Sequence, residues 1–348
     1  MKITIGILIF YGITAFYYPD SAKAQQNLSS ADSARRLVDT ALQFAKTRSL
    51  YRMQVNWPEV EDSVRQVAGT AKNIRETMPA IRLLFSLLKD HHGFITYGKT
   101  IYRWDKRSLP LDKAVHKNLI NKYKAGFKLM PQVLDKHYGY LLLPGNNPTH
   151  SGDIERLARQ IRDSLTLFSR RSIKGLIIDL RLNTGGSMWP MIGGLSALFK
   201  PGKLGAFTYA DAQSEEAWGI YNSKVYDGAD TVCAIKSRGK DLSDMKVVIL
   251  LSPYTASSAE ALAISFKGRP NTRFIGEPSA GYTTANESVQ FTPDIGLFLA
   301  TAVESDRNGK SYPDRVTPDE EIVGGDDFDH LLNDQKVTAA LKWLKSRQ

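Results

Sequence analysis

The sequence predicts an α/β fold with a helix-flanked, mostly parallel sheet at its centre. Two apolar runs, at 175–180 and 246–251, are each followed by a turn-rich stretch and then by apolar residues at helical spacing. A third strand candidate lies at 139–143, and a helical pattern at 154–168 separates it from the next strand. Strands that alternate with helices in this way are typical of a parallel sheet covered by its connecting helices.

The remaining chain divides around this core. Apolar positions at helical period predict an N-terminal helical subdomain at residues 25–95. The mixed, basic segment 96–135 is expected to connect this subdomain to a core at 136–348. Within the core, the polar stretch 200–245 predicts a turn-rich excursion, and 335–345 predicts a terminal amphipathic helix.

Residues 1–24 predict a secretory signal peptide. Lys2 precedes an apolar run, and the small residues Ala22 and Ala24 suit cleavage after Ala24. A retained membrane anchor is the alternative, but the run is short for a bilayer span, and no Cys follows it that could carry a lipid. We therefore expect an exported protein, periplasmic or secreted, without stable membrane insertion once this segment is removed.

The composition is that of a folded globular protein. Of 348 residues, 42% are hydrophobic and 24% are charged. The formal net charge of +10 comes from scattered basic residues, so it indicates a solvated surface and does not support nucleic-acid binding. The single cysteine, Cys233, cannot form an internal disulfide, which permits but does not require an oxidising compartment.

Hydroxyl side chains cluster where the helix after the second apolar run begins. Thr255, Ser257 and Ser258 would lie in the positive field of that helix N-terminus, beside free N–H groups that can stabilise an oxyanion. An N-capping serine is the commoner explanation of such a residue. The turn Asn183 to Gly186, after the neighbouring strand, presents further main-chain donors and favours a nucleophile.

Two adjacent histidines follow the last of three helical patterns in the N-terminal subdomain, the one with Met78, Ile81 and Leu84 on its apolar face. His91 or His92 would supply the base that a serine nucleophile requires. Histidines at such a position are more often surface or capping residues. No third ligand of suitable spacing accompanies them in the sequence, so we expect no metal site, and no organic cofactor is implied.

Five blocks, in order, carry a family resemblance. They are LLKDHHGF (87–94), GYLLLPG (139–145), GLIIDLRLNTGG (175–186), VVILLSPYTASSAEALA (247–263) and RFIGEPSAG (273–281), followed by VTPD (316–319). Together they resemble the S41 family of serine peptidases, which includes the C-terminal (tail-specific) processing proteases and the tricorn-type proteases. The resemblance implies a mixed sheet of the ClpP/crotonase-like type and peptide-bond hydrolysis.

The resemblance also implies roles for residues of the two turns. The family nucleophile lies three residues before the glutamate of a Ser-x-x-Glu pattern, which matches Ser257 and Glu260, with Ser258 as the fallback. The oxyanion hole would use Gly185 or Gly186 together with the amide of Ser258. Glu260 would have a structural role in the first turn of the helix.

The general base separates the two branches of the family. Tail-specific proteases use a lysine at the position that Tyr282 occupies here, and no Lys lies between Lys267 and Lys310. A tyrosine is a poor substitute because its unperturbed pKa is about 10. The tricorn-type branch uses a histidine after the N-terminal helical region, and His92 matches that position. The resemblance therefore implies His92 as general base and then as general acid.

The carboxylate that would orient this base is not at its matching position. That branch places a glutamate shortly before the closing Pro-Asp, where this chain has Ser311-Tyr312-Pro313-Asp314. Asp314, Glu287 and Asp90 are the candidates that remain open.

The expected substrates are peptides or unfolded proteins. Too few residues lie between His92 and Tyr138 for the PDZ module of tail-specific proteases, so selection by C-termini is not expected. The main alternative is a non-catalytic peptide- or lipid-binding protein on the same fold, which the missing Lys and Glu would favour. An esterase shares the acyl chemistry and stays open, and the sequence leaves the oligomeric state undetermined.

Overall fold

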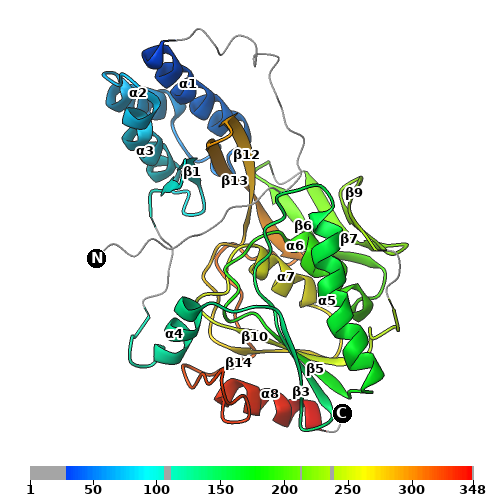
Figure 1. The fold of residues 1–348 in the computed structure, drawn as a ribbon. Helices are drawn as coiled ribbons and strands as arrows, with labels where there is room; N and C mark the ends of the chain where they lie inside the picture. The colour runs from blue at the N-terminus through cyan, green and yellow to red at the C-terminus, as the bar shows by residue number, and fades with distance from the viewer. Residues whose placement is uncertain (1–28, 106–110, 212–213, 236–238, 347–348) are drawn as a thin grey trace.

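A six-stranded mixed sheet forms the core of the computed structural model, which describes residues 29–105, 111–211, 214–235 and 239–346 (Figure 1). Its strand order is β14–β11–β10–β5–β4–β3. The bounds are β3 (Met130–Leu134), β4 (Tyr138–Leu142), β5 (Gly175–Asp179), β10 (Lys246–Leu251), β11 (Thr272–Gly276) and β14 (Glu320–Glu321). All neighbours pair in parallel except β3, which is antiparallel to β4.

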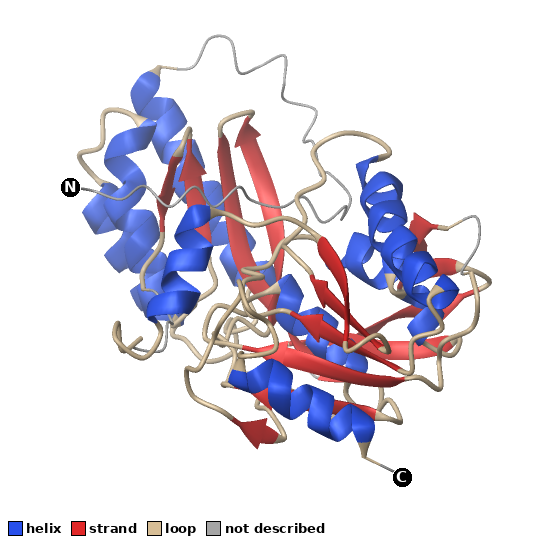
Figure 2. Cartoon of the chain, turned by 60° about the horizontal axis from the view of Figure 1, so that its bottom comes forward, coloured by secondary structure: helices blue, strands red, loops and turns tan. Residues whose placement is uncertain are grey.

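Helices cover both faces of this sheet (Figure 2). One face packs against α5 (Asp153–Arg170), α6 (Met188–Gly194) and α7 (Ser258–Phe266), and the other against α4 (Lys117–Ala125) and α8 (Gln335–Lys345). Successive side chains of a strand point to opposite faces, so Ile177 packs in the α8 layer and Ile178 in the α5 layer. Burial on both faces is why β5 and β10 are continuous apolar runs.

A second sheet is antiparallel throughout and has the order β2–β1–β13–β6–β7–β8–β9, with β12 also paired to β13. Its bounds are β1 (Phe94–Tyr97), β2 (Thr100–Tyr102), β6 (Gly202–Tyr209), β7 (Glu215–Tyr221), β8 (Lys224–Asp227), β9 (Asp230–Ala234), β12 (Thr284–Thr292) and β13 (Ile295–Asp306). The predicted excursion at 200–245 therefore contains four strands, because short hairpins with one solvated face have too few apolar residues for a clear period.

The N-terminal helices form a lobe on this second sheet. Helices α1 (Ser30–Arg48), α2 (Trp57–Ala68) and α3 (Met78–Leu88), with the 3₁₀ turn η2 (Ile74–Thr77), bury their apolar faces against β13. Leu84 of α3 and Leu297 and Leu299 of β13 belong to one buried cluster. In Figure 1 β12 and β13 rise from the core into this lobe, so the strands connect the two parts.

The segment 96–135 does more than connect. It contains β2, α4 and β3, and the last two belong to the core sheet and its covering layer. The signal-peptide prediction for residues 1–24 lies outside the described residues. Within the described ranges, no helix is long and apolar enough to cross a membrane.

Candidate active site

Ser257 lies between β10 and α7 in a backbone conformation that side chains rarely adopt. Its φ is 55° and its ψ is −124°. The preceding residues hold it there, because the Thr255 hydroxyl donates to the Leu180 carbonyl at 2.9 Å and the Ala256 amide donates to the Asn183 carbonyl at 3.1 Å. A non-glycine residue held at positive φ marks a position that the surrounding structure over-determines, and such positions cluster at active sites.

The glycine turn after β5 packs directly against Ser257. Gly185 and Gly186 have φ values of 111° and 129°, which favour glycine. A Cβ on Gly185 would lie 2.9 Å from the Ser257 Cβ, and one on Gly186 would lie 2.4 Å from the Asn146 carbonyl oxygen. The structure thus brings together the two turns that the sequence analysis singled out.

The candidate oxyanion donors differ in their hydrogen bonds. The Gly185 amide donates to the Asn183 side-chain oxygen at 3.0 Å, so that N–H is already used. The Ser258 amide is at the first position of α7, where an N–H group has no carbonyl four residues earlier in the helix. The Ser258 hydroxyl donates its proton to the Gly186 carbonyl oxygen. Gly186 and Ser258 are therefore the better-placed pair of amides.

Glu260 is fully buried and organises the main chain around Ser257. Its Oε2 accepts the Ser257 amide at 2.7 Å and the Tyr282 amide at 2.8 Å, and its Oε1 accepts the Gly281 amide at 2.8 Å. Burial raises the pKa of Glu260 to about 7, although these hydrogen bonds oppose the rise. Its contacts are those of a residue that positions the backbone.

His92 follows α3 and is oriented by a threonine. Its Nδ1 lies 2.8 Å from the Thr284 hydroxyl oxygen, and its carbonyl accepts a hydrogen bond from the Asn286 amide group at 3.2 Å. With the proton on Nδ1, the ring donates to Thr284 and Nε2 keeps its lone pair. Burial, and then the positive charge of Arg103, lower the pKa of His92 to about 3. The imidazole is therefore neutral at neutral pH, as a general base requires.

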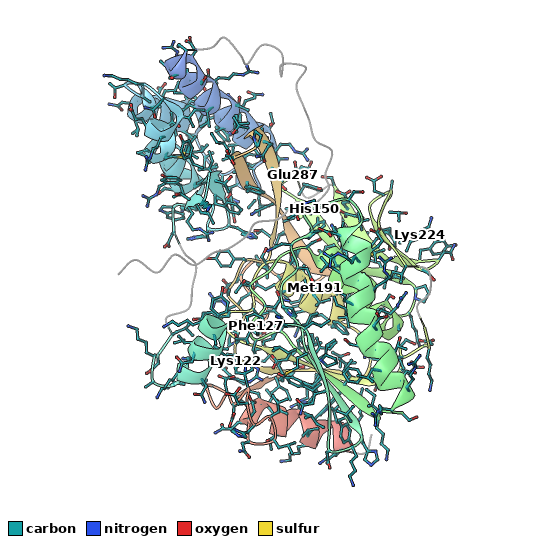
Figure 3. All side chains as sticks on the ribbon, in the orientation of Figure 1. Lys122, Phe127, His150, Met191, Lys224 and Glu287 are labelled. Atoms are coloured by element: carbon teal, nitrogen blue, oxygen red, sulfur yellow. The ribbon has the colours of Figure 1, made fainter. Side chains whose placement is uncertain are left out.

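Tyr282 contacts His92 through its ring and is linked to Ser257 through Glu260. Its ring centroid is 5.1 Å from that of His92, and its amide shares the Glu260 Oε2 with the amide of Ser257. The loop from Gly281 to Thr284 thus contacts both the base and the serine turn. Figure 3 shows Glu287, on β12 just beyond this loop, where the helical lobe meets the core.

The three carboxylates considered from the sequence have other contacts. Asp90 is buried and accepts the His92 and Gly93 amides at 3.0 and 2.6 Å, so it shapes the main chain of the histidine loop. Glu287 forms an ion pair with Arg48. Asp314 is exposed and lies 3.4 Å from the Arg315 guanidinium. Thr284, which orients His92, was missed because no motif marks it.

Potential metal ligands do not gather around this arrangement in the described chain. Within those residues, no group of three or more His, Cys, Asp or Glu is arranged to hold a metal ion. Two surface hollows, of about 400 and 310 Å³, are lined by residues 132–135 with 329–333 and by residues of β6 to β9. Neither includes Ser257 or His92.

Comparison with known proteins decides the family. The model of peptidase family S41 matches residues 137–322, which is more than half of the chain. The chain belongs to peptidase family S41. The resemblance found from the sequence blocks is thereby confirmed, and the two turns, β10, α7 and the Gly281–Thr284 loop all fall within the matched region of this S41 peptidase.

Similar proteins extend over nearly the whole S41 chain. A nisin-resistance protein from Lactococcus lactis subsp. lactis is 28% identical over 320 residues, which are 90% of this chain and 88% of that protein. A lipoprotein structure from Streptococcus agalactiae has a TM-score of 0.69 at 24% identity, covering 92% of this chain and 98% of that one.

The photosystem II D1 C-terminal processing protease has a TM-score of 0.55 at 14% identity, covering 89% of this S41 chain and 97% of that one. At such identities the likeness concerns the fold. It confirms the predicted α/β class, with helices around a mixed sheet.

Proposed function

We propose that this S41 protein is a serine peptidase in which Ser257 is the nucleophile and His92 the general base. The observation that carries the proposal is the placement of both residues around Tyr282, whose amide shares a carboxylate oxygen with Ser257 and whose ring faces His92. Acyl transfer needs a neutral, oriented imidazole within hydrogen-bond reach of the serine hydroxyl, and the contacts through Tyr282 support this arrangement for His92 and Ser257. Family membership supports hydrolysis of peptide bonds.

The reaction follows from these positions. His92 Nε2 accepts the hydroxyl proton as Ser257 Oγ attacks the carbonyl carbon of the substrate, and the amides of Gly186 and Ser258 donate to the oxyanion. The protonated imidazole then gives its proton to the leaving amine, and an acyl-enzyme forms. Water, deprotonated by His92, then attacks the acyl carbon, and the imidazolium gives its proton to Ser257 Oγ as the acid product leaves.

Labelling with a fluorophosphonate probe tests the nucleophile directly. We expect wild type and Ser258→Ala to be labelled, Ser257→Ala to lose labelling, and His92→Ala to be labelled at least about a hundredfold more slowly, the low end for general-base catalysis. Labelling that survives Ser257→Ala but not Ser258→Ala would move the nucleophile by one residue. A protein that resists the probe in every form would instead be a peptide- or lipid-binding protein on this fold.

Peptides and unfolded proteins are the proposed substrates, and export is proposed from residues 1–24. Unfolded casein is a general test substrate. Nisin is a second test substrate, because a relative that aligns with most of the chain is named a nisin-resistance protein. Cleavage of neither, with intact labelling, would favour the esterase alternative. N-terminal sequencing of protein from the exported fraction should begin at Gln25, and a retained Met1 would contradict export.

A further inference from the structure

The outer edge of β12 is open. Among the residues that the structure describes, β12 pairs with β13 alone, so one of its edges has no strand beside it. All nine residues of β12 are half-buried, whereas β13, enclosed on both edges, is buried at every position except Val303. An unpaired edge presents main-chain N–H and C=O groups that can pair with another chain.

Contacts of β13 show which of its residues point away from β12. The Ala300 amide donates to the Asp90 carboxylate at 3.0 Å, and the Gly296 amide donates to the Thr96 hydroxyl at 2.9 Å. Both partners lie on the β1 side of β13. The N–H and C=O of one strand residue point to the same edge, and the direction alternates along the strand. The residues at 296, 298 and 300 therefore face β1, and those at 297 and 299 face β12.

The register then fixes the direction of the β12 main chain. Asn286, Ser288 and Gln290 lie opposite Ala300, Phe298 and Gly296, which point away from them. In such non-hydrogen-bonded pairs both main chains point outward. Asn286, Ser288 and Gln290 thus direct three N–H and three C=O groups to the open edge over ~14 Å of strand.

This open edge is continuous with the candidate active site. Thr284, the first residue of β12, holds the imidazole of His92, and Asn286 donates to the His92 carbonyl. The other side-chain atom of Asn286, Oδ1, is buried without a hydrogen-bond partner. A β-bulge between Ala285 and Asn286 marks where the edge turns beside the site. The three outward-facing residues have uncharged polar side chains, so recognition here would depend on main-chain groups.

We propose that the substrate binds as an added strand on the outer edge of β12. The ligand is an extended stretch of about five residues of unfolded polypeptide, which pairs with the outward groups of Asn286, Ser288 and Gln290. This places one end of the stretch beside His92. Main-chain pairing accepts many side chains but excludes folded segments, whose own N–H and C=O groups are already used. The inference rests on the proposed peptidase function and specifies how its substrate is held.

A proline at position 288 tests this pairing. Ser288→Pro removes one outward N–H without removing a bond of the ladder, because Glu287 and Val289 supply the bonds to β13. Its matched partner Ser288→Ala keeps that N–H. Both changes are made in the Ser257→Ala background, and affinity is measured with fluorescein-labelled casein, so the result does not depend on catalysis. We expect the Kd of the proline variant to be at least about tenfold that of the alanine variant.

Further measurements distinguish a failure of this inference from a failure of the proposed function. In the Ser257-containing protein, fluorophosphonate labelling rates of the proline and alanine variants should agree within about twofold, because the probe does not reach the edge. Equal Kd values for casein would overturn strand addition even if labelling establishes the serine. Wild-type protein that dimerises in sedimentation experiments, with Ser288→Pro monomeric, would assign the edge to a second copy and also overturn it.

A substrate-side measurement provides a second test. A peptide taken from the casein fragments that wild type cleaves is N-methylated at single residues in turn. Strand pairing predicts that methylation reduces cleavage at alternate residues, because only every second amide faces the enzyme. Uniform or absent effects of methylation would contradict an added strand.

Discussion

At the scale of single residues, three side chains fix the geometry of the candidate site. They are Ser257, Thr284 and Glu260. Ser257 is held at positive φ by hydrogen bonds from its neighbours, and the buried Glu260 ties its amide to the loop that faces His92. Thr284 contacts His92 Nδ1, whereas a carboxylate was expected to orient this imidazole. A hydroxyl can orient the imidazole through Nδ1, but it adds no negative charge, so burial keeps the pKa of His92 low.

Replacing Thr284 tests the orientation of the base. Thr284→Val preserves shape but removes the acceptor for the Nδ1 proton of His92. We expect kcat/KM for casein to fall about tenfold, the equivalent of roughly 1.4 kcal/mol for one hydrogen bond. Thr284→Ser should restore most of it, and thermal unfolding should show both variants folded. Full activity of Thr284→Val would mean that another group orients the ring.

The charge of Arg103 gives a pH-dependent prediction. The proposed base works unprotonated, so activity should fall as the pH drops through the pKa of His92, and Arg103 lowers that pKa. Arg103→Gln removes the positive charge, so the acid limb of the kcat/KM profile should move to higher pH by a fraction of a unit. Arg103→Lys keeps the charge and is the matched control. Superimposed acid limbs of the two variants between about pH 2.5 and 6 would contradict this assignment.

At the scale of elements, a cluster of buried charged residues connects α8 to the start of the glycine turn after β5. Its members are Asp179, Arg181, Glu277, Asp326, Asp334 and Lys336, all buried. Arg181, which begins the turn after β5, pairs with Asp179 at 2.6 Å and with Asp326 and Asp334 at 2.7 Å. Asp334 also caps α8 through the Val337 amide. The turn that packs against Ser257 is thus anchored to the C-terminal helix.

Lys336 provides a test of this anchoring. It lies on α8 and donates to Glu277 at 3.0 Å and to Asp326 at 2.9 Å. Lys336→Met leaves two buried carboxylates without this cation, so we expect the free energy of unfolding to fall by about 3–5 kcal/mol in urea. Lys342→Met, on the exposed face of the same helix, should change it by no more than about 0.5 kcal/mol. Equal effects of the two changes would show that the cluster is not coupled to folding.

At the scale of the whole molecule, β13 joins the two parts of the site. Its first half pairs with β1 and packs under the helical lobe, and its second half pairs with β6 of the other part of the sheet. The loop after α3 in the lobe carries His92, and the turn before α7 in the core carries Ser257. Both are needed for the proposed chemistry, and the strand with the open edge, β12, begins at Thr284, which contacts His92.

Prediction from sequence succeeded where the signal was local. The runs at 246–251 and 335–345 form the strand and the helix expected of them. The strands β6 to β9 were not predicted, because their residues alternate weakly and are stabilised by pairing with neighbours. The helical lobe was expected from its period, but its packing against β13 depends on residues about 200 positions away.

The α/β class, the family blocks and the candidates Ser257, Gly186 and His92 could be predicted from the sequence, because they follow from short motifs and apolar periodicity. The contact of Thr284 with His92 and the open edge of β12 became visible only in the folded chain. They depend on residues that are far apart in the sequence. His92 and Thr284 are 192 residues apart, and a contact of that range is set by how strands pair and bulge.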